Sequence, residues 1–449
     1  MHDLKNNIHM KNLPTKKDKI AILGFGVEGI ALNEYFKKKG YKNITIFDEN
    51  SSDPSFEHDI CNLDKYNFVY RSPGIHKDHP ELIKAKNIRV VISSSTQLFF
   101  DNCPCPIVGV TGTKGKGTTS SLIYEILKEA EKDVYLGGNI GQSPLEFLDK
   151  LTENSIVVLE LSSFQLHDIT KSPHIAIVLN TTSDHLDYHK DNEEYLSAKE
   201  GIVKYQTKND ILIVNDDYPY KERYMALTEG KVLKVSRKKL IKNGAYVQNK
   251  EIVLVDNGTT HVICKTDKVG LIGPHNQENI MPAAVACHKL NIPLNAIKKI
   301  AETFTGLPHR LELIKKINGI SYYNDSFSTT PETCIAAIQS FSNPIILIAG
   351  GSEKNSDYTE LGQAISNAKN IKFIILMGKT AERIKKSILE NGDSDKINMV
   401  DSYEKAFNLA HQKAKEGDTI LMSPASASFG MFMNYKHRGD TFRKWVESL

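Results

Sequence analysis

The chain has 449 residues, of which 40% are hydrophobic and 25% charged, which predicts a soluble globular protein of two or three domains. Its 57 basic and 54 acidic residues leave a net charge of +3, so no global field marks a nucleic-acid binder. The spacing of Cys103 and Cys105 fits neither a zinc ribbon nor a CxxC redox pair. The N-terminus lacks the apolar core of a signal peptide, and no apolar run could span a bilayer. We therefore expect a cytoplasmic protein with reduced thiols.

Short apolar runs alternate with amphipathic stretches, which predicts parallel sheets built from βαβ units. The predicted strands are 19–23, 43–47, 67–71, 107–111, 155–161, 175–180, 210–214, 344–349, 371–377 and 418–422. Breaks at 101–106 and, after a helical region at 278–301, at 305–309 predict domains 1–104, 105–306 and 307–449. Between residues 231 and 266, Asn243-Gly244 and Asn257-Gly258 indicate hairpin turns of a small antiparallel insert.

The first glycine-rich motif is Gly24-Phe25-Gly26-Val27-Glu28-Gly29, between a predicted strand and a helix, with Asp48 at the end of the next strand. Such glycines let a diphosphate approach a helix N-terminus, and a downstream carboxylate can bind ribose hydroxyls. The pattern does not say which nucleotide binds. A tight turn between strand and helix, without a ligand, is the alternative explanation.

A second glycine-rich motif predicts a site for a nucleoside triphosphate. In Gly109–Thr119, Lys116 can reach the β- and γ-phosphates and a following hydroxyl can bind Mg²⁺. Leu122, Ile126 and Ala130 recur on one face of the helix that follows. The Walker pattern fails at Val110 and at Gly117, so Thr118 must supply the hydroxyl.

Polar side chains follow the next two predicted strands, where the edge of a parallel sheet holds ligands. Glu160 ends one strand and could hold Mg²⁺, and Asp184-His185-Leu186-Asp187 follows the other. Each residue alone is equally typical of a helix cap or a surface hydrogen bond.

Polar clusters also follow strands in the last third of the chain, at residues 324–326, 350–354 and 423–428. Arg310 and Lys354 could bind a carboxylate or a phosphate, although ordinary loop chemistry and surface charge explain these clusters equally well.

Several of these stretches together resemble the Mur ligase family, and most of all its D-glutamate-adding branch, over almost the whole chain after Lys17. The stretches that carry the resemblance are 24–29, 71–75, 111–119, 137–141, 160–165, 184–187, 273–279, 305–310, 324–326 and 423–428. The resemblance implies an α/β protein of three domains. A Rossmann-like N-terminal domain would bind the UDP substrate. A central P-loop-type ATPase domain with a parallel sheet would bind ATP and Mg²⁺, and a Rossmann-like C-terminal domain would bring glutamate.

The resemblance also implies roles for individual residues. The UDP-substrate contacts would be Gly24, Phe25, Gly26, Gly29, Asp48, Gly74, Asn139 and His185. The ATP contacts would be Gly112, Thr113, Lys114, Gly115, Lys116, Gly117, Thr118, Asn276, Asn279, Arg310 and Asp325. Two Mg²⁺ ions would be bound by Thr118, Glu160, His185 and Lys199, and glutamate by Lys354, Ser428 and Tyr435.

The implied reaction forms an acyl phosphate on the alanyl carboxylate of UDP-N-acetylmuramoyl-L-alanine, which the amine of glutamate then displaces, in peptidoglycan precursor synthesis. Lys116, His185 and Lys199 would be the catalytic residues, and Lys199 matches the lysine that the family carbamylates into an oxygen ligand for Mg²⁺. Small-molecule substrates, no nucleic acid, no membrane and a monomeric state are expected.

The sequence departs from the family pattern in the glycine-rich loop and at two later positions. In the loop, Lys114 replaces the usual asparagine and Gly117 the usual serine or threonine. Gly117 is typical of the related folylpolyglutamate synthases, which lack the N-terminal domain and the 160–165 stretch found here. Phe327 replaces a lysine usual in D-glutamate enzymes, and Tyr435 replaces a phenylalanine. D-glutamate is the favoured substrate. The L-isomer is the alternative, because ligases with a similar Asp-Ser-x-Ser-Thr-Thr-Pro run add L-glutamate.

Two other classes of protein explain less of the sequence. An NAD-dependent dehydrogenase would account for residues 24–29 but not for the loop at 111–119. A non-catalytic nucleotide-binding protein would tolerate the changes in that loop, but it gives no reason for Glu160, His185 and Lys199 to occur together.

Overall fold

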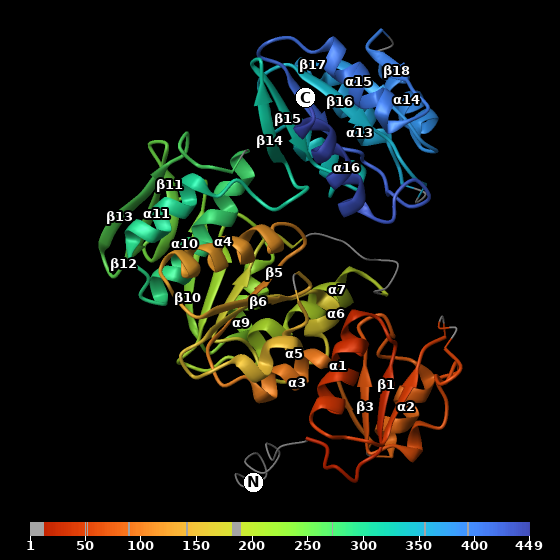
Figure 1. Ribbon diagram of the computed structural model, residues 1–449. Helices are drawn as coiled ribbons and strands as arrows, with labels where there is room; N and C mark the ends of the chain where they lie inside the picture. The colour runs from red at the N-terminus through yellow and green to blue at the C-terminus, as the bar shows by residue number, and fades with distance from the viewer. Residues whose placement is uncertain are drawn as a thin grey trace. The chain divides into compact units, whose positions relative to one another are not determined.

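The computed structural model describes residues 13–49, 51, 53–88, 90–140, 142–181, 190–271, 273–353, 356–392 and 395–449 (Figure 1). The chain divides into two compact units, one of residues 1–267 with 277–301 and one of residues 268–276 with 302–449. The first unit holds two sheets and the second holds one.

The N-terminal sheet has four parallel strands in the order β2-β1-β3-β4. These strands are β1 (Ile20–Leu23), β2 (Ile44–Phe47), β3 (Phe68–Arg71) and β4 (Val91–Ser93). Helix α1 (Val27–Lys38) and helix α2 (Pro80–Asn87) lie on opposite faces of this sheet (Figure 1). Helix α1 buries Leu32 and Phe36 against one face, and α2 buries Leu82 against the other. The 3₁₀ turn η1 (Leu63–Lys65) precedes β3, and α3 (Ser95–Asn102) follows β4.

The central sheet has nine strands in the order β13-β12-β11-β10-β9-β8-β5-β7-β6. The strands are β5 (Ile107–Thr111), β6 (Val134–Gly138), β7 (Ile156–Glu160), β8 (Ile175–Val178), β9 (Ile211–Asn215), β10 (Lys231–Ser236), β11 (Gly244–Gln248), β12 (Glu251–Asp256) and β13 (Thr259–Lys265). The ladder from β6 to β11 is parallel, whereas β12 pairs antiparallel with both β11 and β13.

The helices of the central region are α4 (Lys116–Glu129), α5 (Pro144–Phe147), α6 (Ser163–Leu166), α7 (Asn192–Lys199), α8 (Gly201–Lys204), α9 (Lys221–Leu227), α10 (Gln277–Lys289) and α11 (Leu294–Thr303), with the 3₁₀ turn η2 (Leu148–Lys150). Helix α4 packs on β5, β6 and β7 and also contacts α10. Leu122 and Ile126 lie on its buried face, as their spacing predicted. Ala130, the third residue of that pattern, is half-buried and lies just past the end of the helix.

The second unit contains one mixed sheet in the order β14-β15-β19-β16-β17-β18, parallel except for the β14–β15 hairpin. Its strands are β14 (Glu312–Ile317), β15 (Ile320–Asn324), β16 (Ile345–Ala349), β17 (Ile371–Leu376), β18 (Ile397–Met399) and β19 (Thr419–Met422). Helices α12 (Pro331–Ile338), α13 (Thr359–Asn367) and α14 (Ala381–Leu389) supply the core on one face, and α15 (Tyr403–Lys413) and α16 (Tyr435–Glu447) on the other. The turn η3 (Pro274–Asn276) also belongs to this unit.

All ten strands predicted from the sequence are present, each within two residues of its predicted ends. Strands such as β5 and β16 are rich in valine and isoleucine and have no exposed residue. This is expected of parallel strands whose sheet is covered by helices on both faces. The predicted helical region at 278–301 is two helices, because Pro293 separates α10 from α11.

The predicted antiparallel insert is partly wrong. Its strands extend the central sheet, and β10 runs parallel to both of its neighbours. Asn257-Gly258 is a hairpin turn with two positive φ angles, as predicted. Asn243-Gly244 is not a hairpin turn, because it lies between β10 and β11, which run parallel. The other hairpin turn is Asn249-Lys250, where two non-glycine residues take φ of 50° and 62°.

All six cysteines are free thiols. No helix among the described residues is long and apolar enough to cross a membrane.

Candidate active site

The glycine-rich turn after β1 is held closed by the next strand. The backbone N–H of Phe25 donates to Asp48 Oδ2 at 2.7 Å, so Asp48 ties the turn to the end of β2. A Cβ at Gly29 would lie 2.1 Å from the carbonyl oxygen of Gly24, so only glycine lets α1 start this close to the strand. The tight turn and the predicted nucleotide contact are therefore compatible readings of the same motif.

The loop after β3 lies beside this turn. Ser72 Oγ donates to the carbonyl oxygen of Gly24 at 2.8 Å, and Gly74 follows two residues later on an exposed stretch. Gly26 is also exposed. The predicted UDP contacts Gly24, Gly26 and Gly74 thus gather at the carboxyl edge of the four-stranded sheet.

The predicted phosphate loop joins β5 to α4 in the middle of the central sheet. Lys116 is the first residue of α4 and is half-buried. Its Nζ donates to the carbonyl oxygens of Gly112 (3.0 Å) and Thr113 (3.1 Å), because the side chain folds back over the loop. Lys114 is exposed, whereas Gly117 is buried in the first turn of the helix.

Asn279 on α10, one of the predicted ATP contacts, lies against this loop. Gly115 has a φ of 89°, and a Cβ there would lie 2.3 Å from Asn279 Oδ1. Thr119 Oγ1 donates to the same oxygen at 3.3 Å. Asn276 is buried in η3, which belongs to the second unit.

Glu160 ends β7, next to the strand that carries the phosphate loop. Its side chain is 7% exposed, and its Oε1 accepts from Asn139 Nδ2 at 3.1 Å. Thr118 is buried in the first turn of α4. Hydroxyl and carboxylate oxygens are the ligands that Mg²⁺ prefers, so the chemistry of this pair fits the predicted metal.

Lys199 is 2% exposed at the end of α7, which places a lysine amine in the protein interior. Its Nζ lies 4.5 Å from the ring centroid of Tyr195, one helical turn earlier. Tyr195 OH is 2.9 Å from Thr113 Oγ1 of the phosphate loop. Lys199 is thus connected to the loop through Tyr195, a residue to which the sequence analysis gave no role.

Two of the predicted site residues, His185 and Lys354, lie outside the described residues, as do Asp184 and Asp187 beside the first of them.

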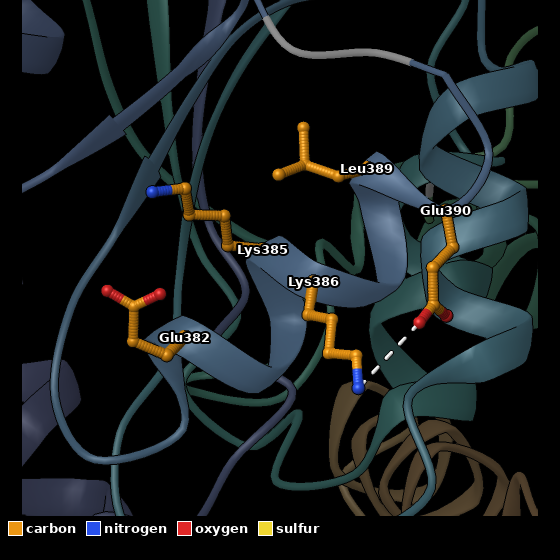
Figure 2. A pocket seen from close by; sticks show the side chains of 5 residues that line it. All are labelled: Glu382, Lys385, Lys386, Leu389 and Glu390. Atoms are coloured by element: carbon orange, nitrogen blue, oxygen red, sulfur yellow. Dashed lines mark ion pairs between the residues drawn. The ribbon is translucent and has the colours of Figure 1, made fainter.

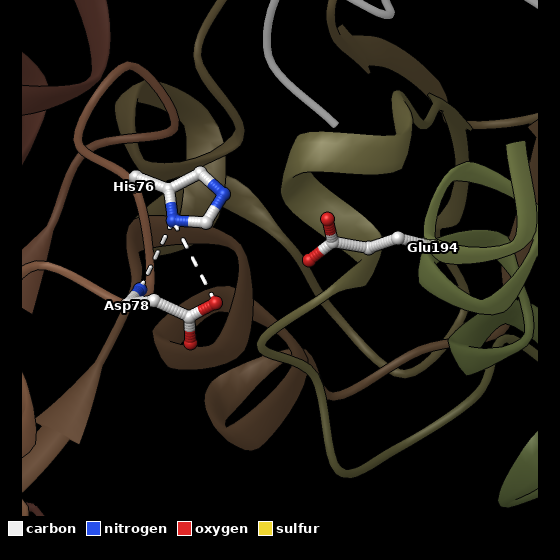
Figure 3. Close-up of side chains that lie close together, drawn as sticks. All are labelled: His76, Asp78 and Glu194. Atoms are coloured by element: carbon white, nitrogen blue, oxygen red, sulfur yellow. Dashed lines mark hydrogen bonds and ion pairs between the residues drawn. The ribbon is translucent and has the colours of Figure 1, made fainter. Parts of the chain in front are cut away.

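Among the described residues, one set of side chains has the spacing of a metal site, namely His76, Asp78 and Glu194 (Figure 3). Glu194 already accepts from the backbone N–H of Lys190 at 2.8 Å and pairs with Lys77 at 3.1 Å. These contacts hold the pKa of Glu194 well below its usual range, at about 2. The arrangement is an ion pair between the loop after β3 and α7, and it differs from the predicted Mg²⁺ ligands.

In the second unit, Asp325 is a buried connection between three segments. Its Oδ1 accepts from the backbone N–H of Leu311 at 3.0 Å, and its Oδ2 from the hydroxyls of Ser328 and Ser423. Burial raises the pKa of Asp325 to about 6 despite these hydrogen bonds. In this unit Asp325 therefore organises the loops in which Arg310 and the 423–428 stretch lie.

Arg310, Phe327 and Tyr435 form a second cluster in this unit. The guanidinium of Arg310 lies 5.6 Å from the ring centroid of Phe327, and Phe327 packs edge-on against Tyr435 at 5.1 Å. Ser428 is buried, and its carbonyl oxygen accepts from the backbone N–H of Phe432 at 3.0 Å. The structure thus brings Arg310 and Tyr435 together through Phe327, the residue at which the sequence departs from the family pattern.

Arg438 in α16 is a residue that the sequence analysis missed. Its side chain is fully buried and donates to Ser326 Oγ (2.9 Å) and to the carbonyl oxygens of Ser326, Ser426 and Ala427. Burial lowers the pKa of Arg438. No motif marks it, because only the folded chain brings α16 onto the two serine-rich loops.

The outer face of α14 carries Glu382, Lys385, Lys386, Leu389 and Glu390 (Figure 2). Lys386 and Glu390 form an i,i+4 ion pair at 3.9 Å. This open face contains none of the predicted site residues.

Two family models match the chain. The Mur ligase middle domain matches residues 110–287, and the Mur ligase glutamate ligase domain matches residues 309–426.

Curated relatives match over nearly the full length. UDP-N-acetylmuramoylalanine–D-glutamate ligase of Acetivibrio thermocellus is 38% identical, with 97% of each chain covered. The protein of the same name from Clostridium tetani is 36% identical, with 96% of this chain and 97% of that one covered.

Solved structures share the fold at low identity. The UDP-N-acetylmuramate-alanine ligase MurC of Thermotoga maritima has a TM-score of 0.60 at 18% identity, with 96% of this chain and 99% of that one covered. The MurF ligase of the same organism, in complex with ADP, has a TM-score of 0.59 at 18% identity, with 98% and 100% covered.

Proposed function

The chain belongs to the Mur ligase family, and from this premise we propose that it uses ATP to add D-glutamate to UDP-N-acetylmuramoyl-L-alanine, in peptidoglycan precursor synthesis. The observation that carries the proposal is a phosphate loop at the carboxyl edge of the central sheet in a chain that matches D-glutamate ligases over 97% of its length. The products are ADP, phosphate and the extended UDP-sugar peptide.

The domain assignment follows the three sheets. We assign residues 1–104 and 307–449 as Rossmann-like domains, for the UDP substrate and for glutamate, and residues 105–306 as the ATP domain. The parallel four-stranded sheet with its glycine-rich turn supports the first assignment. We place the reaction in the cytoplasm and propose a monomer.

The chemistry requires two anions, the alanyl carboxylate and the triphosphate, to meet. The backbone amides of the loop and the Lys116 ammonium can offset their repulsion, because Lys116 needs only to leave two carbonyl oxygens to reach a phosphate. The carboxylate attacks the γ-phosphorus and ADP leaves. The amine of glutamate then attacks the acyl carbon, and phosphate leaves as the amide bond forms.

The metal site would be built at the same edge. Thr118 and Glu160 would hold Mg²⁺, whose charge neutralises phosphate oxygens when it is bound. We propose that His185 and a carbamate of Lys199 complete the ligand set. A carbamate turns the buried cation into an anionic oxygen donor, and the buried position of Lys199 beside Tyr195 supports this role.

The glutamate site would lie in the second unit, with Lys354, Ser428 and Tyr435 as its contacts. Arg310 and Asp325 would serve the nucleotide. Asp325 would act by organising its loops rather than by direct contact, since both of its oxygens already accept hydrogen bonds.

The test is phosphate release from ATP in the presence of UDP-N-acetylmuramoyl-L-alanine, D-glutamate and Mg²⁺. We expect release to need all of these components, and mass spectrometry to detect the UDP-sugar extended by one glutamate. ATP turnover that does not depend on UDP-N-acetylmuramoyl-L-alanine or on D-glutamate would overturn the proposal. An absence of turnover with all components present would also overturn it.

A further inference from the structure

Glu28 lies between the two last glycines of the glycine-rich turn, in the first turn of α1. Both of its carboxylate oxygens are bound by side chains from outside the turn. Oε1 accepts from Gln165 Nε2 at 2.7 Å, and Oε2 accepts from Ser95 Oγ at 3.0 Å. A residue of the turn that carries the predicted UDP contacts is thus joined directly to α6 of the central domain.

Gln165 is held from its other end as well. Its Oε1 accepts from the backbone N–H of Ser162 at 3.0 Å and from Ser162 Oγ at 3.1 Å, which completes the capping box of α6. Because a backbone N–H can only donate, the atom facing Ser162 must be the amide oxygen. The amide nitrogen therefore faces Glu28, and an acceptor is required there.

Burying the Glu28 carboxylate costs more free energy than a contact that only holds two elements together would need. Burial raises the pKa of Glu28, and its direct partners, Gln165 and Ser95, are neutral. Arg71, whose charge lowers the pKa of Glu28, is itself paired with Asp168, with its Nε 2.9 Å from Asp168 Oδ2. A neutral pair would tie the two elements together without a desolvated charge.

The surroundings show what the contact positions. Helix α6 begins three residues after Glu160, the proposed Mg²⁺ ligand. Two ion pairs run in the same direction, from Arg71 to Asp168 and from Lys77 to Glu194. The carboxyl edge of the first sheet is therefore joined at three points, to α6, to the turn that follows α6, and to α7.

We propose that Glu28 is a positioning residue for the ligase reaction. Its carboxylate orients the Gln165 amide and, through it, the first turn of α6, which follows Glu160 in the chain. A substrate bound on the glycine-rich turn is thereby aligned with the metal-binding edge. This inference rests on the proposed function, because it needs the UDP substrate on that turn.

The decisive experiment exchanges the two side chains. Glu28→Ala removes the acceptor, and we expect the KM for the UDP substrate to rise about tenfold or more while the KM for ATP changes less than about twofold, since the phosphate loop is untouched. Gln165→Glu sets two carboxylates face to face and should impair the enzyme similarly.

The double variant Glu28→Gln/Gln165→Glu restores every donor and acceptor. The amide introduced at position 28 can donate to the carboxylate introduced at position 165 and accept from Ser95. That carboxylate can in turn accept from the N–H of Ser162. We expect the KM of the double variant for the UDP substrate to return to within about threefold of wild type. The matched control is Glu34→Ala, an exposed glutamate on the same helix, which should change nothing.

Unchanged kinetics in Glu28→Ala, or a double variant as impaired as its two single changes combined, would overturn the inference. A parallel rise of both KM values in Glu28→Ala would also overturn it, as the sign of a general loosening. Should Glu28→Ala fail to fold, the comparison of Gln165→Glu with the double variant decides. Failure of the proposed function is distinct, because the wild-type protein would then show no glutamate-dependent phosphate release.

Discussion

At the scale of single residues, three charged side chains of the proposed site contact other protein atoms. Lys116 donates to two loop carbonyls, and Lys199 lies over the ring of Tyr195. Asp325 accepts from one amide and two hydroxyls. Substitutions at these positions therefore test both activity and stability, and the two effects can be separated.

Lys116→Ala should lower the rate of glutamate-dependent phosphate release about 10²–10³-fold, because a charge-assisted contact to the transferring phosphoryl group is lost. Its half-buried side chain also ties down the loop, so we expect a stability loss of about 1 kcal/mol in urea unfolding. Lys114→Ala, an exposed change in the same loop, is the control for stability. A ligase rate near that of wild type would remove Lys116 from the mechanism.

Lys199→Ala should lose activity by about 100-fold or more, because the proposed carbamate is a ligand of Mg²⁺. A short carboxylic acid such as acetate should restore part of it by supplying an oxygen ligand to the space left in the interior. Lys204→Ala, an exposed lysine on α8, should be unaffected with or without acetate. Full activity of Lys199→Ala would exclude the carbamate.

Asp325 should make stability depend on pH. Its pKa is raised in the folded protein, so its protonated form stabilises the fold below about pH 4, and that contribution is lost as the pH rises to about 6. A rise from about 3.8 to about 6 corresponds to roughly 3 kcal/mol at most.

Asp325→Asn cannot ionise and is the matched comparison. Urea unfolding at pH 4.5 and pH 7 should show wild type losing stability relative to this variant at the higher pH. A difference that stays constant between the two pH values would contradict the raised pKa.

At the scale of elements, the loop from β15 to α12 carries the clearest departure from the family pattern. Phe327 is 44% exposed and lies between Arg310 and Tyr435. A cation usual in D-glutamate ligases is thus replaced by an aromatic ring that itself faces a cation. Arg310 itself belongs to the 305–310 stretch that carries the resemblance to the family, so it does not substitute for that cation.

We expect wild type to turn over D-glutamate and to discriminate against L-glutamate in parallel assays. Phe327→Lys restores the cation usual in D-glutamate ligases, and we expect it to shift the preference further toward D-glutamate if this loop sets the choice of isomer. Phe327→Leu removes the ring without adding charge and is its control. Preferential use of L-glutamate by wild type would contradict the proposed substrate, and an unchanged preference in Phe327→Lys would place the determinant outside this loop.

At the scale of the whole molecule, the proposed reaction needs groups from both compact units. The phosphate loop belongs to the first, and Ser428 and Tyr435 belong to the second. A reaction that passes an acyl phosphate to an amine must exclude water, which favours closure around the substrates.

Small-angle scattering should therefore show a smaller radius of gyration with a non-hydrolysable ATP analogue, UDP-N-acetylmuramoyl-L-alanine and D-glutamate together than without ligands. The stretch Thr305–Pro308, between α11 and β14, is the expected hinge. Each ligand alone provides the control. No compaction with all three would count against closure.

The local content of the sequence determined the ten predicted strands and the glycine-rich loop between β5 and α4. Runs of buried β-branched residues and glycine spacings carry those signals within a few residues. Turn chemistry was less decisive, since Asn249-Lys250 makes the hairpin that Asn243-Gly244 predicted elsewhere. The pairing of strands across the sheet decides which dipeptide forms the hairpin turn, and the dipeptide sequence alone does not show that pairing.

Only the tertiary structure decided which distant residues meet. Tyr195 contacts the phosphate loop 82 positions away, Glu28 contacts Gln165 across 137, and Arg438 reaches Ser326 across 112. Each contact satisfies a buried polar group, and the need for a partner can be inferred from the residue type. The partner's identity depends on chain packing, because hydrogen bonds select whichever donor or acceptor the fold brings within about 3 Å.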